Sequence, residues 1–72
     1  MNPNFVFNQI RRYNKATSQL YKDAALVAAG VHVGLLQKKN IPARQLTNEE
    51  RKRILYFLDI FCQSQGITVT FK

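Results

Sequence analysis

The chain has 72 residues, 46% of them hydrophobic and 21% charged, and its eleven Lys and Arg against four Asp and Glu give a net charge of +7. A chain this short forms one small domain with a thin core, and its single cysteine excludes a stabilising disulfide within the chain. The composition excludes a disordered basic tail, and the positive charge favours a polyanionic partner such as nucleic acid or an acidic protein surface.

The first block of the chain, residues 4–39, has apolar side chains at steps of three or four, as on one face of an α-helix. This pattern leaves open whether the block is one helix or two. The segment NKATS favours two helices, because Thr17 and Ser18 are candidate N-caps. The ring of Pro42 disfavours helix in the residue before it, so we expect the helical block to end by Asn40.

Within this block, the stretch ALVAAGVHVGLLQ at residues 25–37 contains no charged residue. It is too short to cross a bilayer, which takes about 20 apolar residues, so no membrane span is expected. We interpret it as a narrow buried helix in which Gly30 and Gly34 have a close-packing spacing and face the last helix or a second subunit. A less favoured interpretation breaks the helix at Gly30, because DAALVAAGVHVGLLQKKN loosely resembles a helix-turn-helix motif.

Residues 40–47 are predicted to form a loop, and a helix follows over about 48–65. Thr47 and Glu50 have the spacing of a capping box, in which the side chain of each accepts a hydrogen bond from the backbone of the other. Gly66 has the position of the glycine that follows a helix C-terminus. This helix is the element that the sequence defines best.

The last segment, residues 67–71, alternates apolar and polar residues, which predicts a short β-strand with one apolar face. A lone strand needs a partner, so we expect it to pair with the N-terminal segment or with its copy across a dimer. The predicted fold is therefore one mainly α domain over residues 1–72, with two or three helices and a short C-terminal strand.

Candidate catalytic and metal-binding residues are scarce. His32 and Cys62 are the only residues of their types, and nothing in their spacing brings them together. Glu49 and Glu50 are better explained by the start of the last helix than by acid–base chemistry. No phosphate-binding glycine loop and no metal-ligand spacing occur in the sequence. We therefore expect no enzyme activity, no catalytic residue, no metal and no cofactor.

Basic residues carry the main functional signal. If residues 8–22 form one continuous helix, Arg11, Lys15 and Lys22 fall in one stripe that could follow a phosphate backbone. On the last helix, Lys52 and Arg53 point away from the predicted core, whereas Arg51 is expected to pair with Glu49, Glu50 or the loop. The candidate nucleic-acid-binding residues are Arg11, Arg12, Lys15, Lys22, Lys38, Lys39, Lys52 and Arg53.

Tyr56 and Ile60 lie opposite the core side of the last helix, beside an arginine, and residues of these types are common in protein interfaces. The candidate interface residues are Gly30, Gly34, Tyr56, Ile60 and Val69. The function expected from the sequence is that of a small cytoplasmic nucleic-acid-binding or regulatory protein, a homodimer, acting through backbone contacts. The alternative is an adaptor, an inhibitor or a small subunit of a larger assembly that docks on an acidic protein surface.

Overall fold

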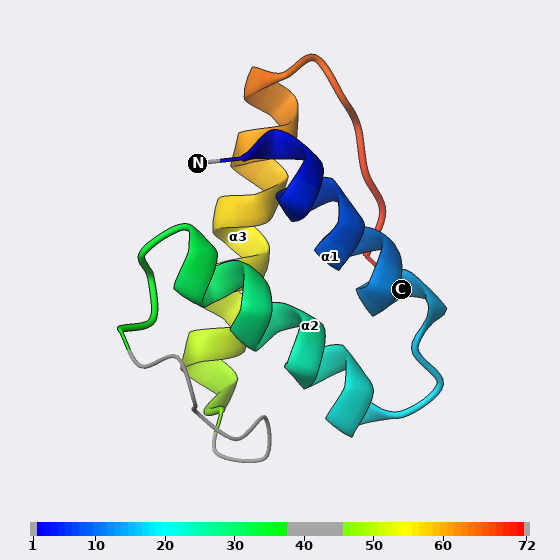
Figure 1. Cartoon of the computed structure of the whole chain (residues 1–72), viewed down its shortest axis with the longest axis vertical. Coiled ribbons are helices and arrows are strands. Elements are labelled where there is room, and N and C mark those ends of the chain that lie inside the picture. The colour runs from blue at the N-terminus through cyan, green and yellow to red at the C-terminus, as the bar shows by residue number, and fades with distance from the viewer. Residues whose placement is uncertain (1, 38–45, 72) are drawn as a thin grey trace.

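The computed structural model describes residues 2–37 and 46–71, and this part of the chain forms three α-helices. These are α1 (Pro3–Lys15), α2 (Gln19–His32) and α3 (Asn48–Ser64). Helices α1 and α2 run back along each other as a hairpin, and α3 crosses behind them in the view of Figure 1. The mainly α fold with three helices is confirmed, and the predicted C-terminal strand is not present.

Two helices, rather than one, occupy the first half of the chain. Helix α1 ends at Lys15, and residues 16–18 form the connection to α2. Ser18 has an extended backbone, and its hydroxyl accepts a hydrogen bond from the N–H of Tyr21 at 3.3 Å, as an N-cap does. The N-cap predicted in NKATS is thus confirmed. The assumption of a continuous helix over residues 8–22 is wrong, because this cap starts a new helix in a new direction.

Helix α2 ends at His32, earlier than the predicted block of 4–39, because Gly34 terminates it. Gly34 has a φ of +86°, and its N–H donates to the carbonyl of Val31 at 3.2 Å. The N–H of Leu35 donates to the carbonyl of Gly30 at 2.8 Å, which completes a Schellman motif. Gly34 therefore serves as the C′ glycine that follows the C-cap residue Val33, and not as the second glycine of a helical packing stripe. Residues 38–45, which include most of the predicted loop, lie outside the described residues.

Gly30 lies inside α2, so the helix-turn-helix interpretation, which breaks the helix there, is wrong. A Cβ at this position would stand 3.0 Å from Leu36 Cδ1 and 3.1 Å from Ile54 Cδ1, which is tighter than nine in ten real Cβ contacts. The absence of a side chain lets Leu36 and α3 approach the helix backbone. The expected close packing against the last helix is confirmed, and because Gly30 is buried within the chain its role as an interface to a second subunit is not supported.

The ends of α3 are formed as predicted. The N–H of Glu50 donates to Thr47 Oγ1 at 3.1 Å, and the N–H of Thr47 donates to Glu50 Oε1 at 2.9 Å, which is a complete capping box. At the other end Gly66 has a φ of +74°, and the N–H of Ile67 donates to the carbonyl of Cys62 at 2.9 Å. This is a second Schellman motif, and it turns the chain back toward α1.

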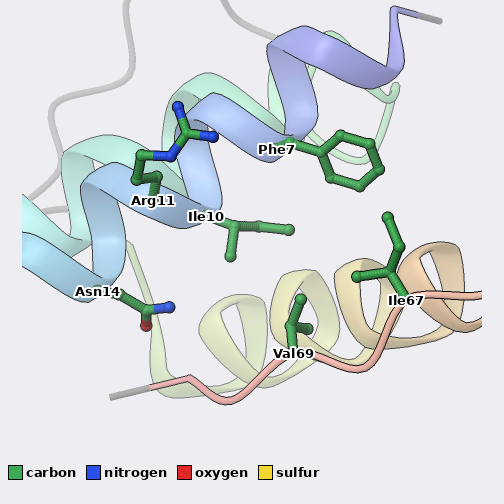
Figure 2. Close-up of a pocket in the computed structure, with 6 residues that line it drawn as sticks. All are labelled: Phe7, Ile10, Arg11, Asn14, Ile67 and Val69. Carbon is green, nitrogen blue, oxygen red and sulfur yellow. The ribbon is translucent and has the colours of Figure 1, made fainter.

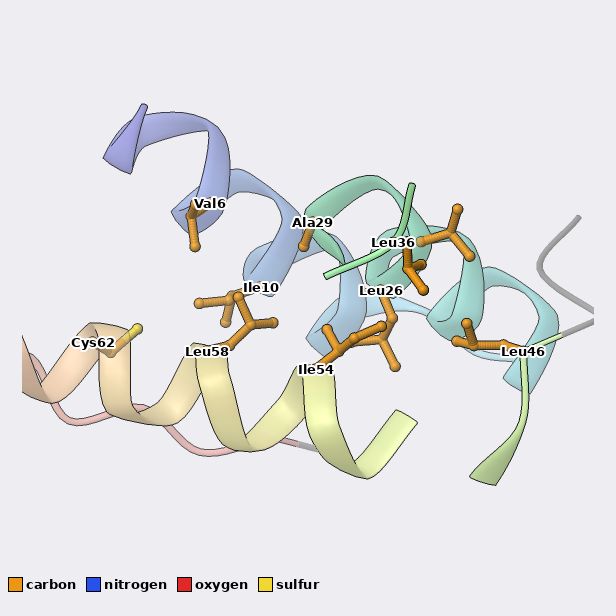
Figure 3. Packing of buried hydrophobic residues seen from close by; sticks show 10 residues of the cluster. Val6, Ile10, Leu26, Ala29, Leu36, Leu46, Ile54, Leu58 and Cys62 are labelled. Atoms are coloured by element: carbon orange, nitrogen blue, oxygen red, sulfur yellow. The ribbon is translucent and has the colours of Figure 1, made fainter. Parts of the chain in front are cut away.

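The hydrophobic core lies between the helical hairpin and α3 (Figure 3). Leu26, Ile54 and Leu58 are its largest fully buried aliphatic side chains, and the Cys62 thiol is buried beside them, as expected of a small hydrophobic residue. The buried hydrophobic residues are Val6, Ile10, Ala25, Leu26, Val27, Ala29, Leu36, Leu46, Ile54, Leu58 and Cys62.

An ion pair joins α2 to α3 at the edge of this core. Arg51 Nε donates to Asp23 Oδ1 and Arg51 Nη2 donates to Asp23 Oδ2, both at 2.8 Å, and Gln19 Nε2 also donates to Asp23 Oδ1 at 2.8 Å. The Asp23 residue is only 2% exposed. Arg51 therefore pairs across the fold, and its expected pairing with Glu49 or Glu50 is wrong. Most of the loop named as the other expected partner lies outside the described residues. The partner lies 28 positions away in sequence, beyond what local spacing indicates.

The C-terminal tail, residues 67–71, is extended but pairs with no strand in the described part of the chain. It passes beside α1 (Figure 1), where Asn14 Nδ2 donates to the Thr70 carbonyl at 2.9 Å and the Tyr13 and Phe71 rings meet edge-on at 5.9 Å. The predicted strand pairing with the N-terminal segment does not occur in the described residues, and the tail instead contacts the last turn of α1. No β-ladder forms because the backbone of that segment is engaged in the hydrogen bonds of α1.

Candidate functional site

Among the described residues, positive charge is concentrated on the helical hairpin. Helix α1 contains Arg11, Arg12 and Lys15 and no acidic residue. Helix α3 contains three basic residues and three acidic ones, so its net charge is zero. The side of the molecule formed by α1 and the start of α2 is therefore the positive side of the described structure.

The cations of α1 are exposed and have no carboxylate partner among the described residues. Asp23 and Arg51 form the only ion pair among residues 2–37 and 46–71. Arg11 Nη1 donates to Asn8 Oδ1 at 3.1 Å and Arg12 Nη1 donates to Gln9 Oε1 at 2.6 Å. These neutral amide partners orient the guanidinium groups without cancelling their charge, so their remaining N–H groups can meet an anion.

Lys22 is used differently from the other predicted cations. Its ammonium Nζ donates to the Tyr13 carbonyl at 3.1 Å and lies 4.3 Å from the centroid of the Tyr13 ring. The ammonium thus satisfies a carbonyl at the C-terminus of α1, where the helix dipole favours a cation. Lys22 is half-buried and holds the hairpin together, which leaves it less available to a ligand than Arg11, Arg12 and Lys15.

A shallow pocket of about 320 Å³ lies at the junction of the two helices, and we call it the junction pocket. Arg12 and Lys15 come from the last turn of α1, and Tyr21 comes from the first turn of α2. The remaining lining residues are Ala16 and Thr17. The Tyr21 residue is 65% exposed, so one aromatic ring and two cations border the same hollow.

Sequence reasoning found Arg12 and Lys15 but not Tyr21 or Thr17. On a continuous helix Tyr21 has no relation to the basic stripe, and it enters the site because the chain turns at residues 16–18. The segment RRYNKATSQLYKD contained a usable signal. Tyr21 lies outside the apolar face of the second helix, and lysines occur before and after it in the sequence.

The other predicted nucleic-acid-binding residues are not gathered at this pocket. Lys52 and Arg53 are exposed near the start of α3, which Figure 1 shows well apart from the last turn of α1. Lys38 and Lys39 lie outside the described residues. The described part of the structure therefore groups the cations of α1, and it separates them from those of α3.

Of the predicted interface residues, Tyr56 and Ile60 are exposed on α3, at 69% and 45%. Val69 faces α1 and lines an apolar groove of about 410 Å³ between α1 and the tail. Figure 2 shows Phe7 and Ile10 on one wall of this groove and Ile67 and Val69 on the other, with the Arg11 guanidinium directed away from the tail.

His32 and Cys62 do not meet at a common site. His32 Nε2 accepts a hydrogen bond from the backbone N–H of Asn2 at 2.9 Å, and its ring stacks on Phe5. Cys62 is fully buried, and this burial, together with the nearby Asp59 carboxylate, raises the pKa of its thiol. Within the described ranges no cluster of three or more His, Cys, Asp or Glu is placed to hold a metal. None of the helices described has the length and apolar character needed to span a bilayer.

No protein-family model, curated protein or solved structure matches this chain.

Proposed function

We propose that this protein binds nucleic acid through phosphate contacts on the positive side of its helical hairpin, without reading base sequence. The observation that carries the proposal is the junction pocket, where Arg12 and Lys15 are exposed and have no carboxylate partner among the residues described. Arg11, the neighbouring residue on α1, is also exposed and lines the groove between α1 and the tail.

The chemistry of these groups suits a phosphate backbone. A guanidinium donates to two phosphate oxygens at once, and an ammonium adds a compact charge beside it. Cations that already had carboxylate partners would lose those ion pairs on binding. That loss would reduce the free energy gained from the phosphate contacts. The amide partners of Arg11 and Arg12 instead hold the side chains in place while the positive charge stays available. The side-chain oxygens of Asn8 and Gln9 are engaged by these two guanidinium groups, which favours backbone contacts over base reading.

Charge removal at two places tests the proposal. The variant Arg12→Gln/Lys15→Gln removes the cations of the junction pocket, and Lys52→Gln/Arg53→Gln removes the same charge from α3 as a matched control. We expect the first variant to weaken binding to a labelled oligonucleotide by about ten- to thirtyfold at low salt, and the control to weaken it by less than about threefold. Equal losses in the two variants would mean that only net charge matters and would contradict the assignment to the hairpin.

A second candidate function is docking on an acidic protein surface or self-association through α3. It is favoured by Tyr56 and Ile60, which are exposed one turn apart on the outer side of that helix beside exposed Arg53. Such residues are typical of interface centres. Sedimentation of wild type and of Tyr56→Ser/Ile60→Ser tests the homodimer directly: a dimer that the variant dissociates supports this candidate, and a wild-type monomer contradicts self-association.

A further inference from the structure

We infer that the junction pocket holds an unpaired nucleotide, with its base stacked on the Tyr21 ring and its phosphate bound by Arg12 and Lys15. This inference rests on the proposed function and makes it more specific, because it selects single-stranded over double-stranded nucleic acid. The carrying observation is an exposed aromatic ring beside two cations that lack a carboxylate partner in the described structure.

The exposure of Tyr21 distinguishes it from the other aromatic residue of the hairpin junction. Tyr13 is half-buried, with the Lys22 ammonium 4.3 Å from its ring centroid and the edge of Phe71 against it. Tyr21 is 65% exposed and no ring contact engages it among the residues described. Its ring is therefore accessible to a flat partner, and it is held in place by the first turn of α2, where its own N–H bonds to the Ser18 hydroxyl.

The two cations stand at the right place for the phosphate of the same nucleotide. Arg12 and Lys15 come from the last turn of α1 and line the same hollow as Tyr21, so the phosphate of a base stacked on the ring would lie within the same pocket as the two cations. The pocket volume of about 320 Å³ falls in the lower part of the range of about 300–1,000 Å³ found for small-molecule sites, which suits one nucleotide. The helix dipole of α1 would by itself explain cations in its last turn. It does not explain why an exposed tyrosine lies beside them.

A duplex cannot use this arrangement fully. Its bases are stacked on each other, so no base face is available to a protein ring, whereas a single strand offers one at every position. Stacking on an aromatic side chain tolerates every base, which agrees with binding independent of sequence. Tyr21 should therefore contribute to the binding of single strands and not of duplexes.

Tryptophan reporters in the full-length chain test the location of the base. The chain contains no tryptophan, so Tyr21→Trp and the equally exposed Tyr56→Trp each place one indole at a known position. With an oligothymidylate of about 12 nucleotides, we expect the fluorescence of Tyr21→Trp to be quenched and that of Tyr56→Trp to be unchanged. Equal responses at the two positions would overturn the inference.

Affinity measurements with Tyr21→Leu test the stacking itself, and Tyr56→Leu is the control. Circular dichroism shows whether each variant is folded. We expect Tyr21→Leu to lose about tenfold in affinity for the single strand, with no change for a duplex of the same sequence. Inorganic polyphosphate, which has no bases, should bind wild type and Tyr21→Leu equally.

The outcomes separate this inference from the proposed function. If Tyr21→Leu binds the single strand like wild type while Arg12→Gln/Lys15→Gln does not, phosphate binding stands and the nucleotide pocket is wrong. If neither the single strand nor the duplex binds wild type even at low salt, the proposed function fails and the inference fails with it.

Discussion

The ion pair between Asp23 and Arg51 should make the stability of this protein depend on pH in acid. Burial of the Asp23 carboxylate would raise its pKa, but the hydrogen bonds from Arg51 and Gln19 and the charge of Arg51 outweigh burial, so the pKa of Asp23 is lowered. A carboxylate with a lowered pKa stabilises the fold above its unfolded pKa of about 3.9, and this contribution is lost as the pH falls through the folded pKa.

The variant Asp23→Asn keeps the shape of the side chain and removes its charge. Removing one partner of a fully buried ion pair costs about 3–5 kcal/mol. The Arg51 side chain is 25% exposed and can turn to water, so we expect Asp23→Asn to lose about 2 kcal/mol at pH 7. That is a large part of the total of about 4–10 kcal/mol expected for a domain of 72 residues.

Urea unfolding followed by circular dichroism, at pH 7 and at about pH 2.5, measures this contribution. We expect the stability difference between wild type and Asp23→Asn to be largest at pH 7 and to narrow at about pH 2.5. This pH lies below the unfolded pKa of about 3.9, where the unfolded chain of wild type binds the proton more readily than the native state, whose pKa is lowered. The control Asp59→Asn makes the same chemical change on α3. Among the described residues that carboxylate accepts a hydrogen bond only from Gln63, so the control should change stability by less than about 0.5 kcal/mol. A difference between wild type and Asp23→Asn that stays constant with pH would refute the electrostatic explanation.

Three further predictions concern the glycines and the cysteine. Gly34→Ala should cost about 1 kcal/mol in urea unfolding, because a φ of +86° strains any residue with a Cβ, and an unchanged midpoint would speak against the Schellman motif. Gly30→Ala should leave the free energy of unfolding nearly unchanged, because the gain of about 1 kcal/mol in helix propensity is offset by the displacement of Leu36 and Ile54. Gly30→Val should lower the free energy of unfolding by at least about 2 kcal/mol. If valine is tolerated as well as alanine at this position, the close packing of α2 is wrong. The Cys62 thiol should react with a thiol reagent far more slowly in the native protein than in urea, because it is buried and its pKa is raised; similar rates in both would contradict its burial.

The sequence predicted the local features of this fold well. Ser18 was one of two candidate N-caps beside Thr17, Thr47 was identified as an N-cap and Gly66 as a helix-ending glycine, because each of these functions depends on residues at most four positions away. Gly34 was misinterpreted because a pair of glycines four residues apart fits a packing stripe as well as a C-cap. Only the backbone conformation at Gly34 distinguishes the two.

Long-range features could not be predicted from spacing. Asp23 and Arg51 meet only because α3 crosses the hairpin, and Tyr21 joins the cations of α1 only because the chain turns at Ser18. The tail alternates like a strand, and its apolar side chains do face the protein, but alternation alone does not supply a strand for its backbone to pair with. Tertiary arrangement decided each of these features.

The salt dependence of oligothymidylate binding tests the assignment of phosphate contacts to Arg12 and Lys15 most directly. For single strands, the logarithm of the binding constant falls against the logarithm of the salt concentration with a slope of about 0.7 per neutralised phosphate. Removing both cations in Arg12→Gln/Lys15→Gln should therefore lower the magnitude of the slope by about 1.4, while Lys52→Gln/Arg53→Gln leaves it unchanged. Identical slopes for wild type and Arg12→Gln/Lys15→Gln would show that these two residues contact no phosphate, which would contradict the proposed site.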